Sequence, residues 1–158
     1  MSTEKRKLYL AYGSNLNVFQ MRRRCPGAKM VGAATIPDYQ LLFKGSGSGA
    51  YLTIEPKPGS SVPVGVWSVT ASDEDALDVY EGFPDFYYKK EMTVEVKEEK
   101  SGETRERETF VYIMHEERPL GWPSGAYVRT CMDGYRAFGF DYAFLMDALK
   151  ASVTKEDE

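Results

Sequence analysis

The chain has 158 residues, about the size at which one hydrophobic core forms one domain, so we expect a single domain over residues 1–158 with a core from about 7 to 152 and polar termini. Its formal net charge of −4 argues against the positive field that nucleic-acid-binding proteins need. No apolar stretch approaches the roughly 20 residues of a membrane-spanning helix, and the opening "MSTEKRK" lacks the apolar segment of a signal peptide. We therefore expect a cytoplasmic protein with neither nucleic acid nor a membrane as partner.

The first predicted strand covers residues 7–12, where an uninterrupted apolar run indicates a strand buried on both faces. The run breaks at residues 13–15, Gly-Ser-Asn, and a short helix over 16–24 is expected to follow. Asn15 or Asn17 can cap this helix. Arginines occupy its last turn, where the helix dipole favours cations.

Short strands are expected next, because β-branched and aromatic runs alternate with turn residues at 29–36, 39–44, 50–56 and 62–70. Between the second and third of these, "GSGSG" predicts a hairpin loop, with a flexible lip over a pocket as the alternative. A helix over residues 72–82 interrupts the strands, with Ser72 or Asp73 as its cap and Gly82 as its stop.

The second half of the chain is expected to add a hairpin and then helices. Residues 91–97 alternate between apolar and polar, residues 108–114 are apolar enough for a central strand, and the charged run 98–108 predicts the turn between them. The segments 123–139 and 141–152 are predicted to be helical. Strands with one inserted helix, followed by helices, favour an α+β domain whose sheet can curl toward a barrel.

The inventory of reactive side chains is small. Cys25 and Cys131 lie too far apart in the sequence to indicate a disulfide framework or a zinc site, and we expect Cys131 to lie in the core. The single histidine, His115, stands in the charged stretch "HEERP", which is typical of solvated surface, although it can in principle pair with a serine or cysteine. We therefore expect no metal and no cofactor, and we expect carboxylates to carry any proton chemistry.

The loop at residues 13–15 is the first candidate site. A strand ends there, glycine permits backbone angles closed to other residues, and free amides at the start of the next helix can bind a carboxylate or phosphate. Tyr9 and Tyr12 can donate further hydrogen bonds to such an anion. The alternative is a plain strand-to-helix turn with a good cap.

Glu81 is the second candidate, because it is the last helical residue before the predicted stop. The helix dipole opposes a carboxylate there by about 0.3 to 1 kcal/mol, and Asp78 lies one turn earlier. Apolar and aromatic neighbours can desolvate the carboxyl: Tyr80, Phe83, Pro84, Phe86, Tyr87 and Tyr88. All three effects raise the pKa toward neutrality, as a general acid and base requires. The alternative is an exposed glutamate; of the competing acids, Glu55 is interpreted as a turn residue and Asp73 as a helix cap.

Several segments, in order, resemble the gamma-glutamylcyclotransferase family over about residues 8–150: "YLAYGSNL", "SGAYLTI", "VPVGVWSVT", "LDVYEGFPDFYYKKEMTVEV", "FVYIM" and "PSGAYVRTCMDGYRAFGFDYAFLMDAL". The resemblance implies a small, mostly antiparallel β-barrel flanked by helices, with a ligand pocket at one mouth. It implies that Glu81 is the catalytic acid and base. It also implies substrate-binding residues: Tyr9, Leu10, Ala11, Tyr12, Gly13, Ser14, Asn15, Gly49, Tyr112 and Tyr127.

The reaction that the resemblance implies is an internal cyclisation, classed with lyases and acyltransferases. The α-amine of a gamma-glutamyl amide or dipeptide attacks its own γ-carbonyl, closes the lactam 5-oxoproline and expels the free amine or amino acid, as in glutathione metabolism. One carboxylate, Glu81, suffices to move the proton, without metal or cofactor. Two alternatives remain: a cyclotransferase for gamma-glutamyl-amines in a biosynthetic pathway, and a non-catalytic module that binds a carboxylate metabolite.

Overall fold

Five strands form a closed barrel in the computed structural model, which describes residues 5–46 and 49–152. The strands are β1 (Lys7–Ala11), β2 (Lys29–Ser46), β3 (Gly49–Val69), β4 (Tyr87–Glu98) and β5 (Thr104–Met114). They are joined around the barrel in the order β1-β3-β2-β4-β5. All neighbours are antiparallel except β1 and β5, which pair in parallel with Tyr9 opposite Phe110 and so close the barrel.

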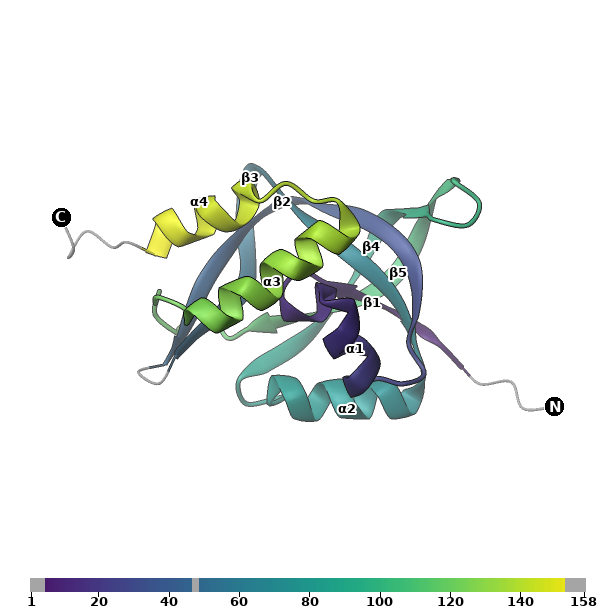
Figure 1. The fold of residues 1–158 in the computed structure, drawn as a ribbon, viewed down its shortest axis with the longest axis horizontal. Helices are drawn as coiled ribbons and strands as arrows, with labels where there is room; N and C mark the ends of the chain where they lie inside the picture. The colour runs from purple at the N-terminus through teal and green to yellow at the C-terminus, as the bar shows by residue number, and fades with distance from the viewer. Residues whose placement is uncertain (1–4, 47–48, 153–158) are drawn as a thin grey trace.

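The helices lie outside the barrel (Figure 1). They are the 3-10 turn η1 (Ser14–Leu16), α1 (Val18–Arg24), α2 (Ala71–Glu81), α3 (Gly125–Phe138) and α4 (Ala143–Ser152). In Figure 1, α1 and α2 lie together near one edge, while α3 and α4 cross the front of the barrel. The predicted α+β fold, a mostly antiparallel barrel flanked by helices, is confirmed.

Two strands are longer than predicted. β2 joins the predicted segments 29–36 and 39–44, because a bulge between Pro37 and Tyr39 absorbs the irregularity without ending the strand. Asp38 takes a left-handed φ of 59° there, and its carboxylate accepts a hydrogen bond of 3.0 Å from the amide of Gly59 across the hairpin. β3 likewise runs through the predicted break between 56 and 62. Part of the "GSGSG" loop, residues 47 and 48, lies outside the described residues.

The charged run 98–108 was predicted as a turn, and this prediction is wrong for its second half. β5 begins at Thr104, so only the tip around residues 99–103 turns. Cross-strand ion pairs stabilise the charged hairpin, since Arg105 and Arg107 lie 3.1 Å and 3.3 Å from the carboxylate of Glu98.

Capping residues set the ends of the two helices beside the site. Asn17, one of the two predicted candidates, caps α1 by accepting a 3.1 Å hydrogen bond from the amide of Gln20. Thr70, not Ser72 or Asp73, is the N-cap of α2, and Asp73 completes a reciprocal capping box with it at 3.0 and 3.1 Å. Gly82 ends α2 as predicted, with a left-handed φ of 66°.

The core holds the loop after β1 in place. Trp67 of β3 is buried, and its indole Nε1 donates a 3.2 Å hydrogen bond to the backbone carbonyl of Asn15. α3 crosses the loop at Gly134, where a Cβ would come within 2.5 Å of the carbonyl carbon of Leu16, so only glycine permits this approach.

Among the described residues, no helix is long and apolar enough to cross a membrane.

Candidate active site

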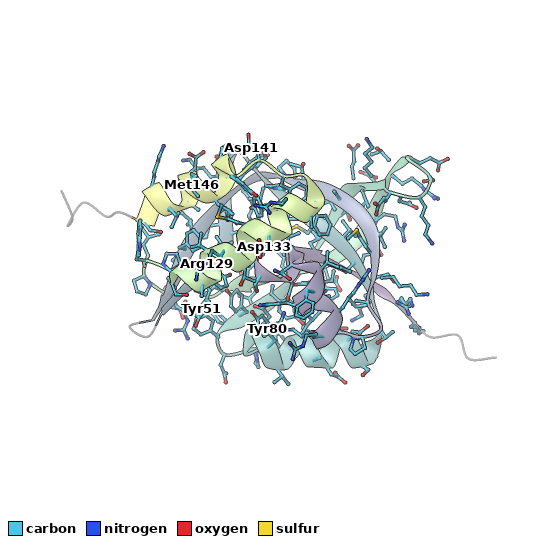
Figure 2. All side chains as sticks on the ribbon, in the orientation of Figure 1. Tyr51, Tyr80, Arg129, Asp133, Asp141 and Met146 are labelled. Atoms are coloured by element: carbon cyan, nitrogen blue, oxygen red, sulfur yellow. The ribbon has the colours of Figure 1, made fainter. Side chains whose placement is uncertain are left out.

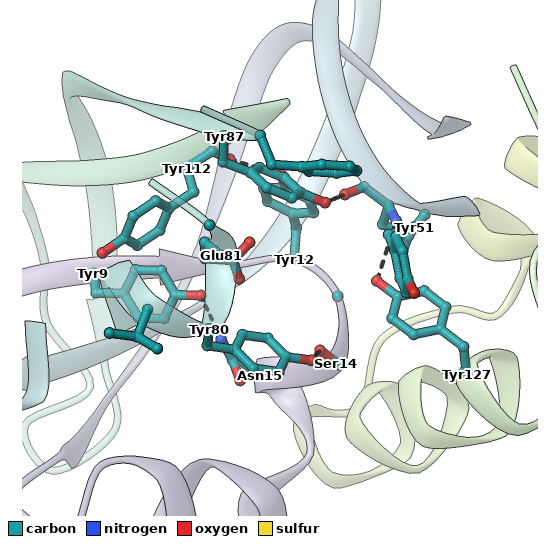
Figure 3. Close-up of a pocket in the computed structure, with 15 residues that line it drawn as sticks. Tyr9, Tyr12, Ser14, Asn15, Tyr51, Tyr80, Glu81, Tyr87, Tyr112 and Tyr127 are labelled. Atoms are coloured by element: carbon teal, nitrogen blue, oxygen red, sulfur yellow. Dashed lines mark hydrogen bonds between the residues drawn. The ribbon is translucent and has the colours of Figure 1, made fainter. Parts of the chain in front are cut away.

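A cavity of about 360 Å³ opens where the end of α2 meets the loop after β1 (Figure 3). Its wall is rich in tyrosine and consists of Tyr9, Tyr12, Gly13, Ser14, Asn15, Tyr51, Leu52, Val79, Tyr80, Glu81, Gly82, Phe86, Tyr87, Tyr112 and Tyr127. Figure 2 labels Tyr51 and Tyr80 on the face crossed by α3, and both line the cavity. Both side chains are 43% exposed and lie at the mouth of the cavity.

The structure brings most of the predicted site residues together on this wall: Tyr9, Tyr12, Gly13, Ser14, Asn15, Glu81, Tyr112 and Tyr127. Leu10 and Ala11 do not line the cavity, although they are buried like Tyr9 and Tyr12 on either side of them. Gly49 does not line it either; it opens β3, and the next wall residues along that strand are Tyr51 and Leu52. Periodicity along one strand did not reveal this, since the closure of the barrel decides which residues face the cavity.

The neighbours predicted for Glu81 are placed only in part. Tyr80, Phe86 and Tyr87 line the cavity with it, whereas Phe83, Pro84 and Tyr88 do not. Val79, Tyr51 and Leu52 were not predicted as wall residues. Val79 comes immediately before Tyr80, the first of the expected aromatic neighbours, and the other two come from β3, which is distant in sequence.

Glu81 stands at the C-terminal end of α2, and Figure 3 shows its carboxyl among the tyrosine rings. Burial raises its pKa from 4.5 to about 8, and the positive charge of Arg24 acts in the opposite direction. The residue as a whole is only half-buried, because the last turn of α2 reaches the surface, but its carboxyl is desolvated by the protein around the cavity. The predicted rise in pKa therefore agrees with the structure, with burial as the main cause.

Asp78 does not act on Glu81 as predicted. Its carboxylate lies 2.9 Å from the ammonium of Lys89 and accepts a 2.6 Å hydrogen bond from the hydroxyl of Tyr112. These contacts neutralise and hold the charge that was expected to repel Glu81. The hydroxyl of Tyr112 is accordingly committed to Asp78.

The other phenols differ in how their hydroxyl groups are used. Tyr12 donates a 2.7 Å hydrogen bond to the carbonyl of Tyr112, and Tyr87 donates one of 2.8 Å to the carbonyl of Leu52. The expectation that Tyr12 donates to a bound anion is therefore corrected, because its proton already has an acceptor. Tyr9, in contrast, accepts a 2.9 Å hydrogen bond from the amide nitrogen of Asn15.

Tyr127 of α3 accepts a 3.1 Å hydrogen bond from the backbone amide of Leu52, which joins α3 to β3 at one side of the cavity. Its ring packs edge-on against Tyr51, with centroids 5.2 Å apart. Burial raises the pKa values of Tyr9, Tyr12, Tyr87 and Tyr127 well above 10, so these groups stay neutral.

The loop after β1 differs from the expected helix start. Gly13 has φ −130°, so it does not use the left-handed region, and a 3-10 turn separates it from α1. The space beside Gly13 is tight, because a Cβ would lie 3.2 Å from the hydroxyl of Tyr127 and 3.4 Å from Leu52, and these side chains would have to shift to admit it. Within the described part of the chain, the amides of Ser14 and Asn15 have no hydrogen-bond partner.

The competing reactive groups lie elsewhere. Glu55 is inside β3 rather than in a turn, and it pairs with Lys44. His115 is bound through Nε2 to the carbonyl of Pro84 at 2.7 Å and is not on the cavity wall. Cys131 is buried, as predicted. In residues 5–46 and 49–152, no group of three or more His, Cys, Asp or Glu side chains is arranged to hold a metal ion.

Comparison with known proteins gives one consistent match. The family described as "Gamma-glutamyl cyclotransferase, AIG2-like" matches residues 9–129. The human gamma-glutamylcyclotransferase is 34% identical over 101 residues, which are 60% of this chain and 52% of that protein. The mouse gamma-glutamylcyclotransferase is 29% identical over 157 residues, 94% of this chain and 80% of that protein. The match to the human protein thus spans about half of that relative's length.

Solved structures agree with the sequence matches. A structure described as a gamma-glutamyl cyclotransferase superposes with a TM-score of 0.75 at 27% identity, covering 93% of this chain and 88% of that one. A yeast gamma-glutamyl cyclotransferase described as specific to glutathione superposes with a TM-score of 0.63 at 14% identity over 94% of this chain and 95% of that one. The second likeness concerns the fold alone.

Proposed function

Because the chain belongs to the AIG2-like gamma-glutamyl cyclotransferase family, we propose that it converts a gamma-glutamyl amide or dipeptide into 5-oxoproline and the free amine or amino acid, with Glu81 as general acid and base. The observation that carries this proposal is the position of Glu81. It is the carboxyl in a tyrosine-lined cavity, and burial raises its pKa to about 8. A carboxyl with that pKa can exchange protons with amines near neutral pH.

The reaction moves two protons, one after the other, from the α-nitrogen of the substrate to the leaving nitrogen. Glu81 as carboxylate removes a proton from the α-ammonium of the substrate, and the freed amine attacks the γ-carbonyl carbon. The new bond joins the α-nitrogen to this carbon, and the bond from the carbon to the leaving nitrogen breaks. Glu81 returns this proton to the leaving nitrogen and, again as a carboxylate, takes the second proton from the attacking nitrogen and passes it to the departing amine, so charge and atoms balance without a protein nucleophile. Because the attack is intramolecular, holding the substrate in its curled conformer supplies much of the rate enhancement.

The loop after β1 is proposed to hold the substrate's α-carboxylate. The amides of Ser14 and Asn15 face no acceptor among the described residues, and the missing side chain of Gly13 leaves room beside Tyr127. Amide donors of this kind bind carboxylates and can also stabilise the oxyanion that forms on the γ-carbonyl. Of the two glycines considered for the oxyanion, only Gly13 lines the cavity, which favours it over Gly49.

The leaving group is proposed to lie toward the mouth of the cavity. The exposed part of the wall there is aromatic and apolar, and it includes Tyr51, Val79 and Tyr80. A gamma-glutamyl dipeptide, glutathione and a gamma-glutamyl-amine share the glutamyl part and differ only in what meets these residues. A panel of such compounds, with 5-oxoproline measured as the common product, identifies the substrate class.

Glu81→Gln tests the proposed role. The change keeps the size of the side chain but removes proton exchange, so turnover should fall about 100-fold or more while binding of the substrate remains. Asp75→Asn is the matched control, because Asp75 is an exposed carboxylate on the same helix and does not line the cavity. Near-normal turnover in Glu81→Gln would reject the acid-base role. Binding of gamma-glutamyl compounds with no 5-oxoproline formed by the unmodified protein would favour the non-catalytic module.

A further inference from the structure

Arg24, in the last turn of α1, connects the loop after β1 with the end of α2. Its guanidinium donates to the side-chain oxygen Oδ1 of Asn15 and lies over the ring of Tyr80, 3.3 Å from the centroid. The neighbouring Arg23 instead lies 5.6 Å from the ring of the exposed Phe19. The favourable position of cations at a helix C-terminus applies to both arginines and does not explain why only one of them reaches the site.

The contact with Arg24 determines which way the amide of Asn15 points. A guanidinium has only hydrogen-bond donors and stays charged, so the atom of Asn15 that faces it has to be the oxygen. The amide nitrogen is thereby directed to the other side, where it donates to the hydroxyl oxygen of Tyr9 at 2.9 Å. Without the arginine, nothing in these contacts prevents the amide from turning over and accepting the proton of Tyr9 instead.

The orientation of Asn15 in turn leaves the proton of Tyr9 available. Tyr9 accepts from Asn15, whereas Tyr12 and Tyr112 have already donated their protons to a backbone carbonyl and to Asp78. The hydroxyl of Tyr9 stands on the cavity wall close enough to Glu81 to feel its charge. In the proposed reaction, Glu81 exchanges protons with the attacking α-nitrogen and with the leaving nitrogen, and each of these is bonded to the γ-carbonyl carbon during the reaction. The γ-carbonyl oxygen therefore has to lie in the same part of the cavity as Glu81.

We propose that Arg24 is a positioning residue which, through Asn15, fixes the hydroxyl of Tyr9 as a hydrogen-bond donor to the γ-carbonyl oxygen of the substrate. This inference rests on the proposed function. Negative charge grows on that oxygen during ring closure, so a donor aimed at it acts mainly in the transition state. Loss of Arg24 or of the Tyr9 hydroxyl should therefore lower kcat more than it raises KM.

A double-mutant cycle tests the connection between the two residues. Tyr9→Phe should lower kcat about 100-fold, the usual effect of removing one such donor. Arg24→Met, which keeps a long side chain but no donor, should lower kcat about 10-fold or more. If Arg24 acts through Tyr9, the double variant should have the kcat of Tyr9→Phe within about threefold. Each kcat is taken at the plateau of the pH profile, because loss of Arg24 also removes a charge that lowers the pKa of Glu81.

Further variants separate this role from a purely structural one. Arg24→Lys should restore most of the lost kcat, because an ammonium also only donates. Arg23→Met should leave kcat and KM unchanged. Asn15→Asp keeps an acceptor for Arg24 but withdraws the donor to Tyr9, so it should lower kcat even where its thermal unfolding temperature equals that of the wild type.

Two results would overturn the inference. One is a double variant whose loss of kcat equals the product of the losses in Arg24→Met and Tyr9→Phe, and the other is an unchanged kcat in Asn15→Asp. These failures are distinguishable from failure of the proposed function. If only the inference fails, Glu81→Gln is still inactive, and only the connection between Arg24 and Tyr9 is wrong. If the proposed function fails, Glu81→Gln itself retains turnover.

Discussion

Glu81→Gln should make the protein more stable than the wild type at alkaline pH but not at acidic pH. Burial raises the pKa of Glu81 from 4.5 to about 8 in the folded protein. Between these two values the folded state holds a proton that the unfolded state has released. The free energy of unfolding of the wild type should therefore decrease as pH rises from about 4.5 to about 8, by the share that Glu81 contributes. Glutamine is neutral at every pH and lacks this dependence.

The size of the effect follows from the shift. Each pKa unit corresponds to about 1.36 kcal/mol, so the full shift would set a ceiling of about 5 kcal/mol. Glu81 is only half-buried, and water in the open cavity reduces the penalty on the charged form. We therefore expect a difference of about 2 kcal/mol between the variants at pH 9, relative to pH 5. For a chain of this length, that is a change in unfolding temperature of roughly 4 to 8 °C.

Thermal unfolding followed by circular dichroism from pH 5 to pH 9 measures this difference. Comparing Glu81→Gln with the wild type at each pH cancels the titration of all other groups. Asp75→Asn should show no such pH-dependent gain, because that carboxylate is exposed. A constant offset between Glu81→Gln and the wild type across the whole range would refute the raised pKa and, with it, the main support for Glu81 as acid and base.

Other measurements follow from the same geometry. The kcat/KM of the enzyme should rise with pH along a limb with an apparent pKa of about 8, set by Glu81 in the free protein; a flat profile between pH 6 and 9 would contradict this. Gly13→Val should weaken substrate binding because its side chain meets the hydroxyl of Tyr127, whereas Gly125→Ala, with only the end of an arginine 3.5 Å away, should bind normally. Replacing the substrate's α-carboxylate by a carboxamide should weaken binding by about 1.5 to 3 kcal/mol, and equal binding of both would argue against the loop as an anion site. Thiol alkylation and chelators should leave turnover intact, since both thiols are buried with their pKa raised to about 12 and no step uses a metal; inhibition by EDTA that zinc reverses would refute the mechanism.

Local sequence signals located the two halves of the site but not their contacts. The glycine stop after Glu81 and the break after β1 are encoded within a few residues, and both are found where the sequence predicts them. The ion pair between Asp78 and Lys89 depends on how α2 packs beside β4, and no local sequence pattern predicts this packing. The raised pKa of Glu81 was therefore predicted partly for a wrong reason, namely repulsion by Asp78. Burial of the carboxyl is the main cause of the raised pKa.

The same distinction applies to the strands. Pro37 and Asp38 are turn residues by local preference, yet β2 continues past them because its partner β3 accepts a bulge at that point. In β1, the apolar run predicted burial on both faces, and the strand is buried almost throughout. Which of its residues reach the cavity depends on barrel closure. Leu10 and Ala11 could not be separated from Tyr9 and Tyr12 by sequence alone.

The position of β1 makes formation of the cavity depend on complete folding of the barrel. β1 leads directly into the loop that forms one wall of the cavity, but its own neighbours are the end of β3 and the middle of β5. These partners are about sixty and about one hundred residues away along the chain, and contacts of that range form slowly. During synthesis, β1 cannot pair with β5 until β5 has been made, so the barrel cannot close before then. A chain with only the β2–β3 and β4–β5 hairpins formed would thus be rich in strand yet have no pocket, and the cavity would form only when β1 closes the barrel.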